Sequence, residues 1–72
     1  MQLSNAKEIV EHLEGEGENA YVMKDYSGRG MFGSKTAAVI ADDASDVLIA
    51  MGTLGIKDSK RQDSMGLGVV IY

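Results

Sequence analysis

The chain has 72 residues, a formal net charge of −4, one histidine and no cysteine. A chain of this length forms one domain, residues 1–72, and the missing cysteines exclude disulfides and thiolate metal sites, so we expect no metal or cofactor. The acidic balance argues against a protein that binds the nucleic-acid backbone, because such a protein needs a basic surface.

The first predicted element is an amphipathic helix over residues 5–14. Its apolar side chains recur every three or four residues and form one stripe. We expect Ser4 or Asn5 to cap its first turn, and an acidic, glycine-containing connection follows over residues 14–19. His12 has no nucleophile placed beside it in the sequence, so we expect a surface or boundary histidine with an acidic neighbour. The stripe consists of Leu3, Ala6, Ile9, Val10 and Leu13.

Two strands are predicted next, over residues 20–26 and 35–41. Alternation places Tyr21 and Met23 on the same side of the first strand. The second strand reads KTAAVIA, an apolar run that is typical of a buried strand. We expect the two strands to pair as an antiparallel hairpin, with the glycine-rich residues 25–35 in a long connection between them.

A second helix is predicted after Asp42 and Asp43, either of which can cap its start. Gly55 is expected to end this helix, with Ile56 folded back on the last turn in a Schellman motif. Its apolar residues again form one stripe, which indicates a helix that packs on the sheet. The stripe consists of Ala44, Val47, Leu48, Met51 and Leu54.

The remaining sequence is a basic connector (residues 57–61), a second glycine-rich loop (residues 62–68) and a third strand (residues 68–72). The order α-β-β-α-β indicates an α+β, two-layer sandwich, with a three-stranded sheet and both helices on one face. A right-handed crossover through the second helix sets the third strand parallel to the second. The pattern leaves open which strand lies beside the third, and whether a homo-oligomer covers the other face of the sheet.

The segment DYSGRGMFGSK, residues 25–35, is the first candidate binding site. It contains the pattern G-x-G-x-x-G, but a strand follows it instead of a helix, so the pattern does not indicate a dinucleotide-binding fold. We predict an anion-binding nest of backbone N–H groups, helped by two cations and an aromatic ring. The alternative is a long hairpin loop without a ligand. The candidate ligand-binding residues are Tyr26, Ser27, Gly28, Arg29, Gly30 and Lys35.

The second candidate segment is RQDSMG, which begins at Arg61. Arg61 can bind a phosphate or carboxylate through two hydrogen bonds, and Asp63 and Ser64 can bind a ribose or a backbone amide. The alternative is that Asp63 or Ser64 forms a turn with its own backbone. If the third strand begins beside one end of the hairpin, the two glycine-rich loops can meet and form one site.

Three apolar side chains in the two loops, Met31, Phe32 and Met65, are candidates for an interface with a partner protein. The sequence shows no nucleophile–base pair, metal-ligand cluster or carboxylate dyad, so we expect a protein that is not an enzyme. We also expect a cytoplasmic protein without membrane contact, because no apolar run is long enough to span a bilayer and the first residues do not form a signal peptide.

The segments YSGRGMFG (residues 26–33) and RQDSMGLGVVIY (residues 61–72) resemble a family of small, uncharacterised bacteriophage and prophage proteins. These proteins share a Y-S-G-R-G-M-aromatic-G loop and a D-S-M-G-L-G segment. The resemblance covers both loops and the last strand, and it implies a phage context with the host cytoplasm as the location. Small acidic phage proteins often counter host defence, by blocking a protein or sequestering a nucleotide signal.

These observations lead us to expect a small binding protein of phage type. Its ligand would be anionic or nucleotide-like and would lie between the two glycine-rich loops. The alternative function is a protein-binding inhibitor or adaptor that acts on a host protein through Met31, Phe32 and Met65.

Overall fold

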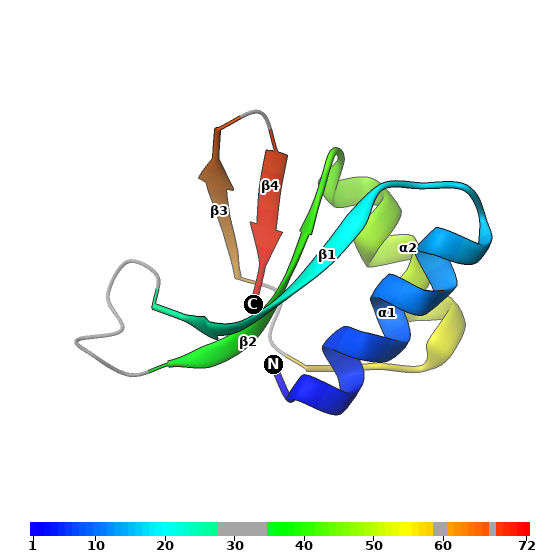
Figure 1. Cartoon of the computed structure of the whole chain (residues 1–72). Coiled ribbons are helices and arrows are strands. Elements are labelled where there is room, and N and C mark those ends of the chain that lie inside the picture. The colour runs from blue at the N-terminus through cyan, green and yellow to red at the C-terminus, as the bar shows by residue number, and fades with distance from the viewer. Residues whose placement is uncertain (28–34, 59–60, 67) are drawn as a thin grey trace.

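The computed structural model describes residues 1–27, 35–58, 61–66 and 68–72, except for the side chain of Met65. The strands form a single open sheet, and the two helices pack on one face of it, as Figure 1 shows. The α+β class and the two helices on one face of the sheet are therefore confirmed. The elements are α1 (Leu3–Gly15), β1 (Ala20–Tyr26), β2 (Thr36–Ala41), α2 (Ala44–Leu54), β3 (Gln62–Met65) and β4 (Gly68–Ile71).

The sheet has four strands in the order β1-β2-β4-β3, so the prediction of three strands is wrong by one. The additional strand is β3, whose sequence QDSM indicates a loop. It forms a strand because it pairs antiparallel with β4, from Gln62 opposite Ile71 to Met65 opposite Gly68. An edge strand with polar side chains carries no hydrophobic alternation, so its sequence resembles a loop.

The additional strand also changes the direction of the last one. β4 is antiparallel to β2, whereas the sequence predicted a parallel pair. The crossover through α2 does produce a strand that runs in the same direction as β2, but that strand is β3, one position further out. The β3–β4 hairpin then turns back and places β4 between β2 and β3. The result is a β-α-β unit that is split by an antiparallel strand.

α1 begins at Leu3, two residues before the predicted start, and neither Ser4 nor Asn5 is its N-cap. The N-cap residue is Gln2, whose side chain makes no capping hydrogen bond. Asp58 caps the helix from a distance in the sequence: its Oδ2 accepts hydrogen bonds from the backbone N–H of Gln2 (3.0 Å) and from Nδ2 of Asn5 (2.6 Å). These donors, the Gln2 N–H above all, lower the pKa of the Asp58 carboxyl below its ordinary value.

Both predicted ends of α2 are confirmed. Asp43 is the N-cap, and its side chain accepts a hydrogen bond of 2.9 Å from the backbone N–H of Ser45. Gly55 follows the last turn with a φ of 71°, a conformation that favours glycine. The N–H of Ile56 then donates to the carbonyl of Met51 at 2.9 Å, which is the bond of a Schellman motif, and the Ile56 side chain is buried.

The buried side chains form a main core between the helices and the sheet and a smaller cluster on the other face of the sheet. The main core includes Ile9 and Leu13 of α1, Met51 of α2 and Val39 and Ile71 of the strands. The smaller cluster, which we call the open-face cluster, covers part of the sheet face that no described helix covers. It consists of Tyr26, Ala38, Val70 and Tyr72, with Met23 and Ile40 packed against it.

A bulge in β1 decides which face Tyr26 occupies. Met23 lies opposite Ala38, but Tyr26 lies opposite Thr36, so β1 contains one residue more than β2 over this stretch. Strict alternation would place Met23 and Tyr26 on opposite faces. The additional residue moves Tyr26 to the open face, where it joins Met23 in the open-face cluster.

Candidate functional site

The first candidate segment and the start of the second join the same end of the sheet, which we call the loop end. β1 ends there at Tyr26 and β2 begins at Thr36, while β3 begins at Gln62 and β4 ends at Ile71. The first glycine-rich segment and the basic connector before β3 therefore both join the sheet at the loop end (Figure 1).

Tyr26 and Asp63, one from each candidate segment, are in contact at the loop end. The Tyr26 hydroxyl donates a hydrogen bond of 2.5 Å to Oδ2 of Asp63. The Tyr26 ring packs on the ring of Tyr72, with centroids 4.8 Å apart and planes inclined by 56°. Tyr26 is 7% exposed, so little of its ring is accessible for a ligand to stack on. This contact ties the start of the first segment to β3.

The predicted cations Lys35 and Arg61 are both exposed and precede β2 and β3 directly. A series of hydrogen bonds through Met1 and Tyr72 connects Thr36, the residue after Lys35, to the backbone of Arg61. The amino group of Met1 donates to Oγ1 of Thr36 (2.8 Å) and to the carbonyl of Tyr72 (3.3 Å), and the N–H of Tyr72 donates to the carbonyl of Arg61 (2.9 Å). Lys35 and Arg61 are therefore anchored to the same end of one sheet.

The turn of the second glycine-rich loop lies at the opposite end, because β3 and β4 meet there with Met65 opposite Gly68. Gly66 has a φ of 60° in this turn. Ser64 neighbours Asp63 along β3, so it faces the other side of the sheet. Asp63 also accepts a hydrogen bond from the N–H of Ser64 at 2.9 Å. The fold thus brings Arg61 and Asp63, but not Ser64 or the glycine turn, to the first segment.

The connecting segments at the two ends of the sheet carry opposite charges. At the loop end, residues 27–35 and 57–61 contain five lysines and arginines and one acidic residue, Asp58. At the opposite end, residues 16–19 and 42–43 contain four acidic residues and no lysine or arginine. The two segments that join the sheet at the loop end therefore carry most of the lysines and arginines of a chain that is acidic as a whole.

Several predicted site residues lie outside the part of the chain that the structure describes. Of Met65, only the side chain lies outside the description. Ser27 lies within it and is exposed. The predicted protein-binding surface depends on residues of this set, so the inhibitor or adaptor function stays a prediction. The residues outside the description are Gly28, Arg29, Gly30, Met31 and Phe32.

Sequence reasoning missed two residues that shape the site. Tyr72 supports the ring of Tyr26, and its place directly after β4, which lies between β2 and β3, depends on the strand order that the sequence left open. Asp58, within the basic connector, accepts hydrogen bonds from Gln2 and Asn5 at the start of α1. Neither role has a local sequence signal, because both partners are distant in the chain.

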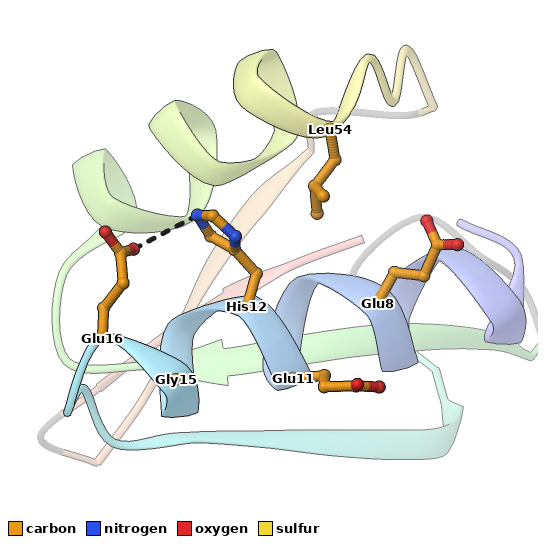
Figure 2. Close-up of a pocket in the computed structure, with 6 residues that line it drawn as sticks. All are labelled: Glu8, Glu11, His12, Gly15, Glu16 and Leu54. Carbon is orange, nitrogen blue, oxygen red and sulfur yellow. Dashed lines mark ion pairs between the residues drawn. The ribbon is translucent and has the colours of Figure 1, made fainter.

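Two hollows in the described surface lie on the helical side, away from the loop end. One, of about 770 Å³, is bordered by both helices. Figure 2 shows Glu8 and His12 of α1, and Glu16 directly after it, on the side that faces α2, with Leu54 of α2 pointing towards α1. His12 lies at the centre of this hollow with Nε2 3.3 Å from Oε1 of Glu16, which confirms a boundary histidine with an acidic neighbour. In the described residues, no three histidine, aspartate or glutamate side chains are placed to hold a metal ion.

Within the described ranges, neither helix has the length and apolar character needed to cross a membrane. Comparisons of this chain with protein-family models, with curated proteins and with solved structures found no match.

Proposed function

We propose that this chain is a small, non-enzymatic binding protein that holds an anionic, nucleotide-like ligand at the loop end of its sheet. The observation that supports the proposal is the charge distribution: Lys35 and Arg61 directly precede β2 and β3 at the same end of the sheet in an otherwise acidic domain. The resemblance to phage proteins supports a role in countering host defence, in which the protein would sequester a nucleotide-derived signal.

The residues of the loop end divide into two roles in this proposal. Lys35 and Arg61 contact the anionic groups, and Arg29, from the segment between β1 and β2, contributes a third cation. Ser27, which is exposed directly after β1, donates a hydrogen bond. Tyr26 and Asp63 hold the two segments together, because the Tyr26 ring is buried and its hydroxyl is bonded to Asp63.

The experiment is an NMR titration of the ¹⁵N-labelled protein with pyrophosphate and with ADP, each at low and at physiological salt. We expect the amide signals of Lys35 and Arg61 to shift, while those of Asp42 and Asp43 at the opposite end stay unchanged. Lys35→Ala and Arg61→Ala should each weaken binding by about three- to tenfold, because exposed charge contacts contribute about 1 kcal/mol and 1.4 kcal/mol is a factor of ten.

Lys7→Ala is the matched control, since Lys7 is an exposed cation on α1 that belongs to neither segment. It should leave the affinity unchanged. Arg29→Ala extends the test to the segment outside the described residues and should weaken binding as well. The proposal fails if neither anion shifts the loop-end amides, or if binding survives all three loop-end substitutions.

A further inference from the structure

The two tyrosine rings at the loop end are closed to a ligand. Tyr26 is 7% exposed and Tyr72 is 6% exposed, and the two rings pack on each other. The third tyrosine of the chain, Tyr21, is exposed, but it lies opposite Ile40, near the other end of the sheet. None of the tyrosines therefore offers its ring to a base that is bound at the loop end.

Both carboxylate oxygens of Asp63 already accept hydrogen bonds. Oδ2 accepts one from the Tyr26 hydroxyl at 2.5 Å, and Oδ1 accepts one from the backbone N–H of Ser64 at 2.9 Å. A ribose hydroxyl would have to compete with these two bonds, and the first of them also joins β1 to β3. Asp63 is therefore a structural acceptor at the loop end, and its carboxylate is poorly placed to select a sugar.

The two cations at the loop end are well separated. Lys35 and Arg61 directly precede β2 and β3, and both are exposed. Because β4 lies between β2 and β3, two strand spacings, or about 10 Å, separate the backbones of the two strands. The register places Ala38 level with Tyr72 and Arg61, and Lys35 lies three positions beyond Ala38. An anion that carries charge along its length can therefore contact both cations more easily than a compact anion can.

We propose that the loop end recognises a linear phosphoanhydride chain and makes no contact that selects a base or a sugar. This inference rests on the proposed function and names the part of the ligand that the protein binds. A chain of three phosphates distributes its charge and contacts Lys35 and Arg61 at once, whereas a single phosphate contacts one of them. The same chain occurs in nucleoside triphosphates and in inorganic polyphosphate, so both classes of molecule should bind.

Isothermal titration calorimetry with phosphate, tripolyphosphate, ATP and UTP tests the inference. The titrations are done at physiological salt, where exposed charges more than about 8 Å apart are largely screened, so that affinity reports direct contacts. We expect tripolyphosphate to bind at least tenfold more tightly than phosphate and at least as tightly as ATP. The affinities of ATP and UTP should differ by less than about threefold, because the base makes no specific contact.

The outcomes separate this inference from the proposed function. A base that stacks on a protein ring adds at least about fivefold to the affinity. If ATP binds at least fivefold more tightly than tripolyphosphate, the protein recognises the nucleoside, so this inference is wrong although an anion site exists. If none of the four ligands binds, the proposed function is wrong as well.

Variants of the two cations test whether one ligand spans both positions. Lys35→Ala and Arg61→Ala should each weaken tripolyphosphate binding about three- to tenfold, because each removes one of the two charge contacts. Each should weaken phosphate binding by no more than about twofold, since a single phosphate can use the remaining cation. Lys7→Ala, at an exposed cation on α1, should change neither affinity. Equal losses for the two ligands would show that no ligand spans both cations.

Two further variants test the absence of sugar and base contacts. Asp63→Asn should change the affinities for ATP and tripolyphosphate by the same factor, whereas a carboxylate that bound the ribose would affect ATP alone. Phe32, the other aromatic residue of the first segment, lies outside the described residues. Phe32→Ala should leave the ratio of the ATP and tripolyphosphate affinities unchanged. A loss of affinity for ATP alone in either variant would overturn the inference.

Discussion

The hydroxyl of Tyr26 and Oδ2 of Asp63 are 2.5 Å apart and connect β1 to β3, the two edge strands of the sheet. In a flat sheet, edge strands of a four-stranded arrangement lie about 14 Å apart. A side-chain hydrogen bond between them therefore needs a curved sheet, whose concave side is the open face. Ala38, which is fully buried between the edges, leaves room for the Tyr26 ring over β2.

This relationship predicts an energetic coupling between Tyr26 and Asp63. Tyr26→Phe should lower the free energy of unfolding by about 1 kcal/mol, because it removes a hydrogen bond but keeps the ring contact with Tyr72. Asp63→Asn should have a smaller effect in the Tyr26→Phe background than in the original chain. Urea unfolding of the two single variants and the double variant gives the coupling free energy directly.

Tyr21→Phe provides the control for that cycle, since Tyr21 is 66% exposed on the same strand. Its effect should stay within about 0.5 kcal/mol. If the effects of Tyr26→Phe and Asp63→Asn are simply additive, the bond between the edge strands does not stabilise the fold.

Gly52→Ala is expected to stabilise the protein by about 1 kcal/mol, because Gly52 lies inside α2 and open space surrounds it. For a domain of this size, that gain corresponds to a rise in Tm of about 4–8 °C. Thermal unfolding followed by circular dichroism measures it. An unchanged or lower Tm would mean that the described chain does need glycine at this position.

Gly68→Ala is expected to have the opposite effect. A Cβ at Gly68 would lie 2.9 Å from the backbone carbonyl oxygen of Ala41, and a backbone atom of a central strand cannot move aside easily. We expect a loss of about 1–3 kcal/mol, as for other overpacked positions. Gly15→Ala, where nothing lies within 4 Å, should be close to neutral in the same denaturant titration. Equal stabilities of the two variants would contradict the close approach.

The cap that Asp58 provides should make stability depend on pH. Its folded pKa is lower than the ordinary 3.8 because the carboxylate accepts hydrogen bonds from Gln2 and Asn5. The stabilisation is therefore complete above 3.8 and is lost as the pH falls through the lower, folded value. The difference in urea midpoint between the original chain and Asp58→Asn should be largest at neutral pH and should shrink in acid. A constant difference would show that Asp58 does not act through its charge.

Most of the elements follow from local patterns in the sequence. The helical stripes, the apolar run of β2 and the caps Asp43 and Gly55 each depend on residues within a few positions of one another. The first cap of α1 could not be predicted in this way, because its acceptor, Asp58, lies 56 positions from Gln2. β3 was missed for a related reason: its four residues form a strand only where β4 supplies partners.

By itself, the sequence determined the class of fold, the paired strands and the two segments that concentrate the cations, because periodicity, caps and charge are local properties. Only the tertiary structure decided that β3 begins at the end of the sheet where β1 ends, and that the glycine turn after β3 lies at the other end. Only the tertiary structure placed Tyr26 on the open face, since one bulge residue reverses the side of every residue after it. The contact between Tyr26 and Asp63 joins residues 37 positions apart, and such a contact depends on how whole strands pair and curve.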